Sequence, residues 1–231
     1  MTPEQDAFCA TCKMSAIRSE NRGPPADERD IKPGQALHVD VQPNMAEQSL
    51  AKRDCFPNCV NIADAKSRKF RCIGTEGTTS QDAIQCISQW ASQNKPSPEH
   101  TLKQHCHETH VDAGSQSISK EFELWCEEET VSLIVAAPHH QEMNGMCERM
   151  WQSARKIAFA LCDEARLGWP FCHHALMHAT RIMDHLPIKG CLRIKDDQQT
   201  QSCPEAVFKG TEQTKIGRFK VFGCPAVAKV F

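Results

Sequence analysis

Short apolar segments of strand length alternate with amphipathic segments of helix length along most of this chain. The predicted strands lie at 36–41, 55–63, 69–73, 102–111 and 131–136. The predicted helices lie at 79–93, 119–128 and from 145 onward. This order, three strands followed by alternating helices and strands, is typical of an α/β protein whose helices pack on a sheet.

The helix predicted after Asn144-Gly145 is the longest in the chain. Its apolar stripe consists of Met146, Met150, Ala154, Ile157, Ala158 and Leu161. At about 100° per residue, Glu148 lies far from the centre of that stripe and opens a polar face that continues into Gln152, Arg155 and Lys156. A further helix starts at Trp169-Pro170 and ends at Pro187, and its predicted buried side is Ala175, Ala179, Ile182 and Leu186.

Three acidic residues stand at the ends of these predicted elements. Asp40 closes the first strand, Asp112 closes the strand at 102–111, and Glu148 opens the long helix. Between Asp112 and Glu148 lie 35 residues. Carboxylates placed in this way can converge on one pair of Mg²⁺ ions, and such a site performs phosphoryl transfer on DNA. The sequence therefore predicts a two-metal site.

Charge is divided unevenly between the two parts of the chain. Residues 1–148 carry 14 Lys and Arg against 22 Asp and Glu, a balance of −8, whereas residues 149–231 carry 13 against 7, a balance of +6. A basic part beside an acidic, metal-attracting part suits an enzyme that cuts or joins DNA. Ordinary solvated surface produces the same asymmetry, so the charge pattern supports a DNA partner without establishing one.

Composition indicates a soluble, intracellular protein. Hydrophobic residues make up 40% of the chain, and no apolar run of about 18 residues predicts a membrane-spanning helix. The first residues lack the basic and apolar regions of a secretion signal. In that setting the 14 scattered cysteines are expected to be reduced thiols that pack as small apolar residues.

Two groups of Cys and His have a spacing that invites a metal interpretation. Cys9 and Cys12 form a Cys-x-x-Cys pair, but a tetrahedral zinc site needs two further ligands, which His38 or a partner chain could supply. We therefore do not expect bound zinc there. His105, Cys106, His107 and His110 form the second group, but alternation along a strand puts Cys106 opposite His105 and His107. A Cys/His-rich metal-binding protein is accordingly the least favoured class.

Several segments, in the same order, resemble Copia-type LTR-retrotransposon integrases. The segment from Asp112 to Phe122 is similar to their Asp-Asn-Gly-Gly-Glu-Phe, and the segment from Pro138 to Arg149 is similar to their Pro-Tyr-x-Pro-x-x-Asn-Gly-x-x-Glu-Arg. The other similar segments are Cys9-Ala-Thr-Cys12-Lys13, His38-Val-Asp40, Asp64-Ala-Lys-Ser-Arg68, Leu186-Pro187, Cys203-Pro204 and Phe219-Lys-Val-Phe-Gly-Cys224. The resemblance covers nearly the whole chain.

The resemblance implies a ribonuclease H-like core, which is a mixed five-stranded sheet flanked by helices. It implies that Asp40, Asp112 and Glu148 are the catalytic triad and hold Mg²⁺ or Mn²⁺, and that Arg149, Gln152, Arg155 and Lys156 contact DNA. It also implies 3′-end processing and strand transfer on element and target DNA, a homo-oligomer, no membrane partner and, by analogy, a nuclear location. By the same resemblance, residues 1–30 are a remnant of a zinc module plus linker, 31–190 the catalytic core, and 191–231 the start of a truncated post-core region.

Other positions depart from the family pattern, so a second interpretation stays open. The departures are Ala113, Gln116, His139, Gln141, Cys172 and Asp184. Loss of a buried Trp costs about 3–5 kcal/mol, which is large beside a total stability of about 5–15 kcal/mol. The alternative is a catalytically inactive integrase remnant that binds nucleic acid or another copy of itself weakly.

Overall fold

A mixed α/β sheet organises the part of the chain that the computed structural model describes, which is residues 31–43, 56–94, 106–112, 119–136, 145–188, 191–195, 198–211 and 219–224. The strands of this sheet are β1 (Ala36–Gln42), β2 (Asn58–Asp64), β3 (Phe70–Thr75), β4 (Glu108–Asp112) and β5 (Ser132–Ala136). They lie in the order β3-β2-β1-β4-β5. The β1–β2 and β2–β3 pairs are antiparallel, whereas β1–β4 and β4–β5 are parallel. The predicted mixed five-stranded sheet is confirmed.

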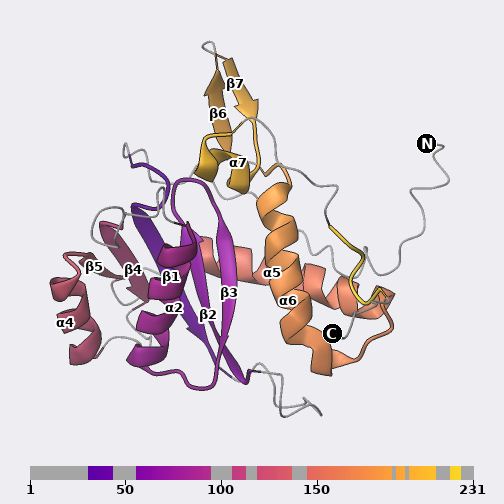
Figure 1. Cartoon of the computed structure of the whole chain (residues 1–231), viewed down its shortest axis with the longest axis horizontal. Coiled ribbons are helices and arrows are strands. Elements are labelled where there is room, and N and C mark those ends of the chain that lie inside the picture. The colour runs from indigo at the N-terminus through magenta and orange to yellow at the C-terminus, as the bar shows by residue number, and fades with distance from the viewer. Residues whose placement is uncertain are drawn as a thin grey trace, which may run out of the picture.

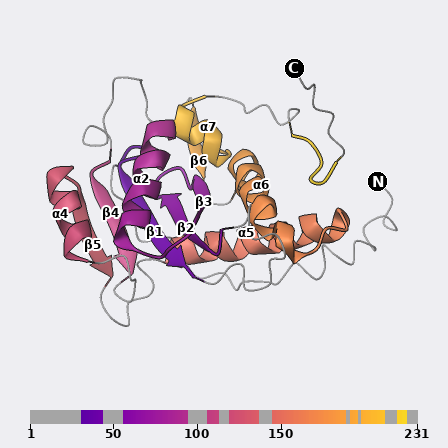
Figure 2. The same ribbon diagram turned by 60° about the horizontal axis from the view of Figure 1, so that its bottom comes forward.

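Helices cover both faces of this sheet (Figures 1 and 2). On one face, α2 (Ser80–Asn94) and α4 (Lys120–Glu128) bury an apolar cluster that includes Leu37, Val39, Val60, Ile62 and Trp90. On the other face, α5 (Gly145–Glu164) and α6 (Cys172–His185) bury a second cluster, which is made largely of alanine, cysteine, methionine and aromatic side chains. Successive residues of a strand belong to different clusters, because their side chains point alternately to the two faces of the sheet.

Helix boundaries follow local signals in the sequence. Ser119 caps α4, and its Oγ accepts a hydrogen bond from the backbone N–H of Phe122. A short 3₁₀ turn, η3 (Trp169–Phe171), precedes α6, which ends at His185. Leu186, predicted on the buried side of this helix, is 43% exposed. That part of the prediction is wrong because Leu186 precedes Pro187, which disfavours helical backbone, and its φ and ψ are −95° and 139°.

The predicted strand at 102–111 begins later in the structure, at Glu108. Cys106 and His107 precede it, and residues 102–105 lie outside the described residues. The other predicted elements up to 164 agree with the structure within about three residues at each end.

A buried aspartate organises the turn between β2 and β3. The Asp64 carboxylate accepts hydrogen bonds from the backbone N–H of Gly34 at 2.6 Å and from the backbone N–H and Oγ of Ser67 at 2.7 and 2.5 Å. Arg68 adopts a left-handed φ of 64° and closes the turn onto the Asp64 carbonyl. Asp64 thereby ties the chain entering β1 to the β2–β3 hairpin.

The segment after α6 forms a hairpin and a short helix. Strands β6 (Leu192–Lys195) and β7 (Gln198–Gln201) project from the rest of the molecule, and α7 (Pro204–Lys209) packs on the core (Figure 1). Buried Lys69 pairs with Glu205 of α7 at 2.5 Å, and the Trp90 and Phe208 rings meet edge to face. Further along, the Phe219 ring contacts the rings of His178 and His185 on α6.

Cysteines within the described residues carry free thiols, as predicted, and all of them except Cys224 are buried. Burial raises the pKa of several of these thiols, to about 12 for Cys86, Cys106 and Cys191, so they are protonated and behave as small apolar side chains. Among the helices that the structure describes, none combines the length and apolar character needed to cross a membrane.

Candidate active site

Asp40 and Asp112 follow the last paired residues of two neighbouring parallel strands. Asp112 ends β4 as predicted, whereas β1 continues for two residues beyond Asp40, so the prediction that Asp40 closes its strand is wrong. Within the β1–β4 pair, His38 is opposite His110 and Val39 is opposite Val111, and each aspartate follows directly. Val39 and Val111 pack into the cluster under α2 and α4. Because side chains alternate along a strand, both aspartates face the α5 side of the sheet.

The first turn of α5 is fixed to the same face. Cys147 is fully buried, and its Sγ donates to the backbone carbonyl of Asn61 at 3.6 Å. Asn61 lies opposite Asp40 in the β1–β2 pair. Cys147 therefore anchors the helix beside Asp40, and the next residue, Glu148, is exposed at the opening of the helix as the sequence predicted.

Electrostatics connect the three carboxylates. The pKa of the Asp40 carboxyl is raised above its ordinary value, first by loss of solvent on burial and then by the negative charges of Asp112 and Glu148. A hydrogen bond from Gln42 acts in the opposite direction. Because the charges of both Asp112 and Glu148 act on Asp40, the three acids, which come from β1, β4 and α5, lie near one another.

Amide side chains already donate to two of these acids. Gln42 Nε2 donates to Asp40 Oδ2 at 2.5 Å, and Gln152 Nε2 donates to Glu148 Oε1 at 3.3 Å. In the part of the chain that the structure describes, no three or more His, Cys, Asp or Glu side chains are arranged closely enough to hold a metal ion. The acids are thus near enough to interact by charge, and two of them already accept a hydrogen bond from an amide side chain.

The polar face of α5 carries the residues predicted to contact DNA. Arg149, Gln152 and Arg155 are exposed, and Lys156 is partly exposed. The guanidinium of Arg155 lies over the ring of Trp151, with 5.8 Å from its central carbon to the ring centroid. The face is therefore solvent-accessible and cationic next to Glu148.

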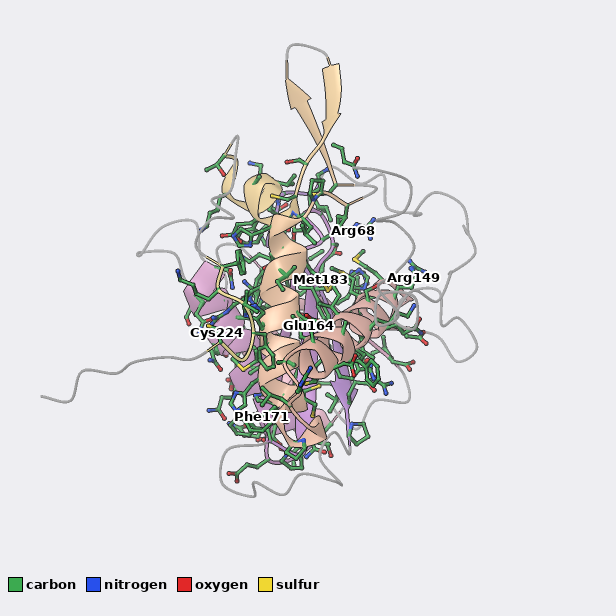
Figure 3. All side chains as sticks on the ribbon, turned by 90° about the vertical axis from the view of Figure 1, so that its right-hand side faces the viewer. Arg68, Arg149, Glu164, Phe171, Met183 and Cys224 are labelled. Atoms are coloured by element: carbon green, nitrogen blue, oxygen red, sulfur yellow. The ribbon has the colours of Figure 1, made fainter. Side chains whose placement is uncertain are left out.

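Figure 3 shows how α5 and α6 are arranged. Helix α5 runs from the neighbourhood of Arg149 to Glu164, and α6 runs between Phe171 and Met183. The segment that ends at Cys224 lies on the other side of α6 from Arg149 in this view. The cationic start of α5 is therefore separated from the C-terminal segment by the body of α6.

Histidines that the sequence singled out occupy two different settings. His110 is buried and stacks on His38, with ring centroids 4.6 Å apart, whereas His107 is exposed. His105, Cys9 and Cys12 lie outside the described residues, so the partial zinc site stays a prediction.

Two of the departures from the family pattern have defined surroundings in this fold. Asp184 is fully buried, forms an ion pair with Arg71 and accepts a hydrogen bond from the backbone N–H of Phe70 at 3.1 Å. Cys172 is 2% exposed and lies at the start of α6. Asp184 is therefore integrated into the fold. The remaining departures, Ala113, Gln116, His139 and Gln141, lie outside the described residues.

The sequence did not predict the residues that contact the acids or fix the helix beside them. Cys147 and Asn61 gave no signal because their role depends on the contact between α5 and β2. Gln42 offered a weak signal, since it lies two residues after Asp40 and so on the same face of the strand.

No protein-family model matches the chain. Among solved structures, the chain is similar to the simian T-cell lymphotropic virus intasome in complex with PP2A regulatory subunit B56 gamma, with a TM-score of 0.59 and 15% identity over 96% of this chain and 69% of that chain. It is also similar to the HTLV-2 integrase catalytic core domain in complex with magnesium. The dimeric form gives a TM-score of 0.51 at 14% identity over 78% of this chain and 99% of that chain, and the trimeric form gives 0.50 at 15% over 70% and 92%. The fold is that of an integrase catalytic core.

Proposed function

We propose that this chain is the catalytic core of a DNA integrase of the Copia LTR-retrotransposon type. In this proposal Asp40, Asp112 and Glu148 hold two Mg²⁺ or Mn²⁺ ions and carry out phosphoryl transfer. The observation that carries it is the position of Asp40 and Asp112 on neighbouring parallel strands, on the face where the Cys147–Asn61 contact fixes the first turn of α5 beside Asp40. An ordinary core has no reason to gather three acids from separate elements, because each raises the cost of ionising the others.

The residues fit a hard divalent cation. Carboxylate oxygens are the ligands that Mg²⁺ prefers, and clustered negative charge favours cation binding. When bound, the ions supply charge neutralisation and activation of the attacking oxygen. In this proposal Asp40 and Glu148 would exchange their hydrogen bonds from Gln42 and Gln152 for a bound cation, and Asp112 would complete the set of carboxylates that hold it.

The protein side chains have distinct tasks in this reaction. Asp40 and Asp112, on adjacent strands, and Glu148, on α5, would hold the cations beside the scissile phosphate. Arg149, Arg155 and Lys156 meet the phosphate backbone, and Gln152 donates to DNA once it leaves Glu148. Arg155 is already oriented by the Trp151 ring, so less conformational freedom is lost on binding.

Two in-line displacements make up the proposed activity. Water first attacks a phosphodiester near the end of the element DNA and releases a short 3′ fragment. The new 3′-hydroxyl then attacks a phosphodiester of target DNA, which forms one ester bond and breaks another. Positioning and charge stabilisation provide most of the catalysis in such transfers. Both ends of the element must be joined to the same target DNA, and each end needs an active site. We therefore propose that the chain acts as a homo-oligomer, in the nucleus.

The test is strand transfer by the purified chain with Mg²⁺ or Mn²⁺ and DNA carrying the terminal sequence of the source element. The chain is compared with Glu148→Gln and with Glu164→Gln. Glu164 is exposed at the far end of the same helix, so its replacement removes the same charge and leaves the acids intact.

The proposal predicts joined product with the unmodified chain and with Glu164→Gln, and a loss of at least about 100-fold with Glu148→Gln. Equal activity of the two variants contradicts the assignment of Glu148. No product from any protein that circular dichroism shows to be folded favours the inactive remnant.

A further inference from the structure

His38 and His110 form a stacked pair directly behind the two candidate aspartates. Their ring centroids are 4.6 Å apart and their planes are inclined by 26°. Both are nearly buried, at 6% and 7% exposure. Each histidine precedes its aspartate by two residues, so the ring pair and the acid pair lie on the same face of β1 and β4.

The pairing between β1 and β4 stops directly before the two acids, at Val39 and Val111. On their outer sides the strands keep their other partners, so Asp40 is paired with Asn61 of β2 and Asp112 with Ala136 of β5. The separation of the two acids is therefore not set by a direct pair between them. It depends on the Val39–Val111 pair directly before the acids and, on the same face of the sheet as the acids, on the contact between the histidine rings two residues back.

Repulsion acts to separate these strand ends. Asp112 raises the pKa of Asp40, so the two charges oppose each other across the gap. An aromatic stack contributes attraction beyond simple burial, with offset or stacked rings favoured at this separation. Glu108, 3.3 Å from His110 Nε2, further restrains the His110 ring.

We propose that the His38–His110 stack is a positioning device that holds Asp40 and Asp112 at the separation a divalent cation needs. This inference rests on the proposed function and extends it, because it assigns a role to residues that touch neither cation nor DNA. The attraction acts through the rings and does not require either histidine to change its charge.

The test measures binding of Mn²⁺ to the purified chain by electron paramagnetic resonance, in which bound Mn²⁺ loses the signal of the free ion. Asp112→Asn identifies the portion of binding that belongs to this site. His110→Leu removes the ring but keeps an apolar side chain, and His110→Phe keeps a ring that can stack. His107→Ala is the matched control, since His107 is exposed on the same segment.

We expect His110→Leu to weaken the Asp112-dependent binding by about three- to tenfold, the scale of a lost aromatic pair. His110→Phe and His107→Ala should remain within about twofold of the unmodified chain. Circular dichroism confirms the fold of each variant. If His110→Leu does not fold, the result for His110→Phe decides alone.

Two results overturn the inference in distinguishable ways. Binding that is unchanged in His110→Leu, or lost in a folded His110→Phe, contradicts a role for ring stacking while leaving the metal site in place. Absence of Asp112-dependent binding in the unmodified chain overturns the metal site itself, and the role given to the stack falls with it.

Discussion

The two faces of the central sheet are built from alternate residues of the same strands, yet they differ sharply in chemistry. On the face under α2 and α4, Leu37, Val39 and Val111 are at most 1% exposed and belong to one apolar cluster. On the face under α5, the intervening positions are His38, Asp40 and His110. Both faces bury apolar clusters, but only the face under α5 also carries charge that opposes stability.

This difference shows how a small α/β core can support a charged site. Burial of apolar area on one face contributes roughly 25 cal/mol per Å², whereas gathered carboxylates raise the free energy of the folded chain. Because both faces share one backbone, side-chain packing on the apolar face also fixes the strand positions that place Asp40 and Asp112. Removal of a buried, well-packed or paired side chain should therefore lower stability strongly, whereas removal of a carboxylate from the acidic end of β1 and β4 should have a small or favourable effect.

The largest effect is expected on the apolar face at Trp90. This side chain is fully buried and meets Phe208 of α7. Trp90→Ala should lower the free energy of unfolding by about 3–5 kcal/mol, measured by urea denaturation.

Trp90→Phe is the matched comparison. In the described part of the chain Trp90 Nε1 has no hydrogen-bond partner, so replacing the indole sacrifices no such bond. The cost should stay under about 1.5 kcal/mol. A loss below 1 kcal/mol for Trp90→Ala, on the order of a surface substitution, would mean that the apolar face does not carry the stability.

The next effect is expected at Asp184, the buried acid of α6. Burial raises its pKa, and Arg71 acts in the opposite direction. Asp184→Ala should cost about 3 kcal/mol, because it leaves Arg71 and the Phe70 N–H without their acceptor. Asp184→Asn keeps an acceptor and should cost about 1 kcal/mol. Equal losses for the two variants in urea denaturation would show that the hydrogen bond is unimportant.

A smaller effect is expected for Arg155 on the polar face of α5. Arg155→Ala should weaken binding to duplex DNA several-fold and reduce the slope of log affinity against log salt by about 1, because one phosphate contact is lost. Fluorescence anisotropy over a salt series measures both quantities. The control is Arg181→Ala, because Arg181 is an exposed arginine on α6. An equal loss of DNA affinity in this variant would show that DNA does not bind preferentially to the α5 face.

The smallest effect is expected at Asp40, and its sign is favourable. The folded pKa of Asp40 is raised, so its charged form costs stability above that pKa, and the cost disappears as pH falls through it. With a chelator at pH 7, Asp40→Asn should therefore raise the free energy of unfolding by about 0.2–1 kcal/mol, the scale of one cross-strand charge pair. The gain should shrink towards acid pH in thermal melts. Destabilisation at pH 7 would contradict the repulsion.

Much of the fold could be predicted from the sequence because its signals are local. Alternation around Val39 and Asp40 predicted a strand, and the polar position of Glu148 on an apolar-striped helix was confirmed by its exposure. The placement of Asp112 at the end of β4 and of Glu148 in the first turn of α5 likewise needed no knowledge of contacts, whereas β1 continues beyond Asp40 to Gln42.

What could not be predicted depends on contacts between distant segments. The parallel register that sets His38 opposite His110 has no signal in either strand alone, because it arises from long-range pairing. The anchoring of Cys147 to Asn61 is a tertiary contact of the same kind. The prediction that Leu186 is buried was wrong for a local reason, because the following proline disfavours helical backbone at this position.

The central claim is that Asp40, Asp112 and Glu148 form one divalent-metal site, and crystals of the chain soaked in Mn²⁺ test it most directly. Anomalous scattering locates the ion without reference to activity. The account predicts a peak about 2.2 Å from carboxylate oxygens of both Asp40 and Asp112, with Glu148 turned towards it. A peak confined to other side chains, or ordered carboxylates of Asp40 and Asp112 with no peak between them, would contradict it.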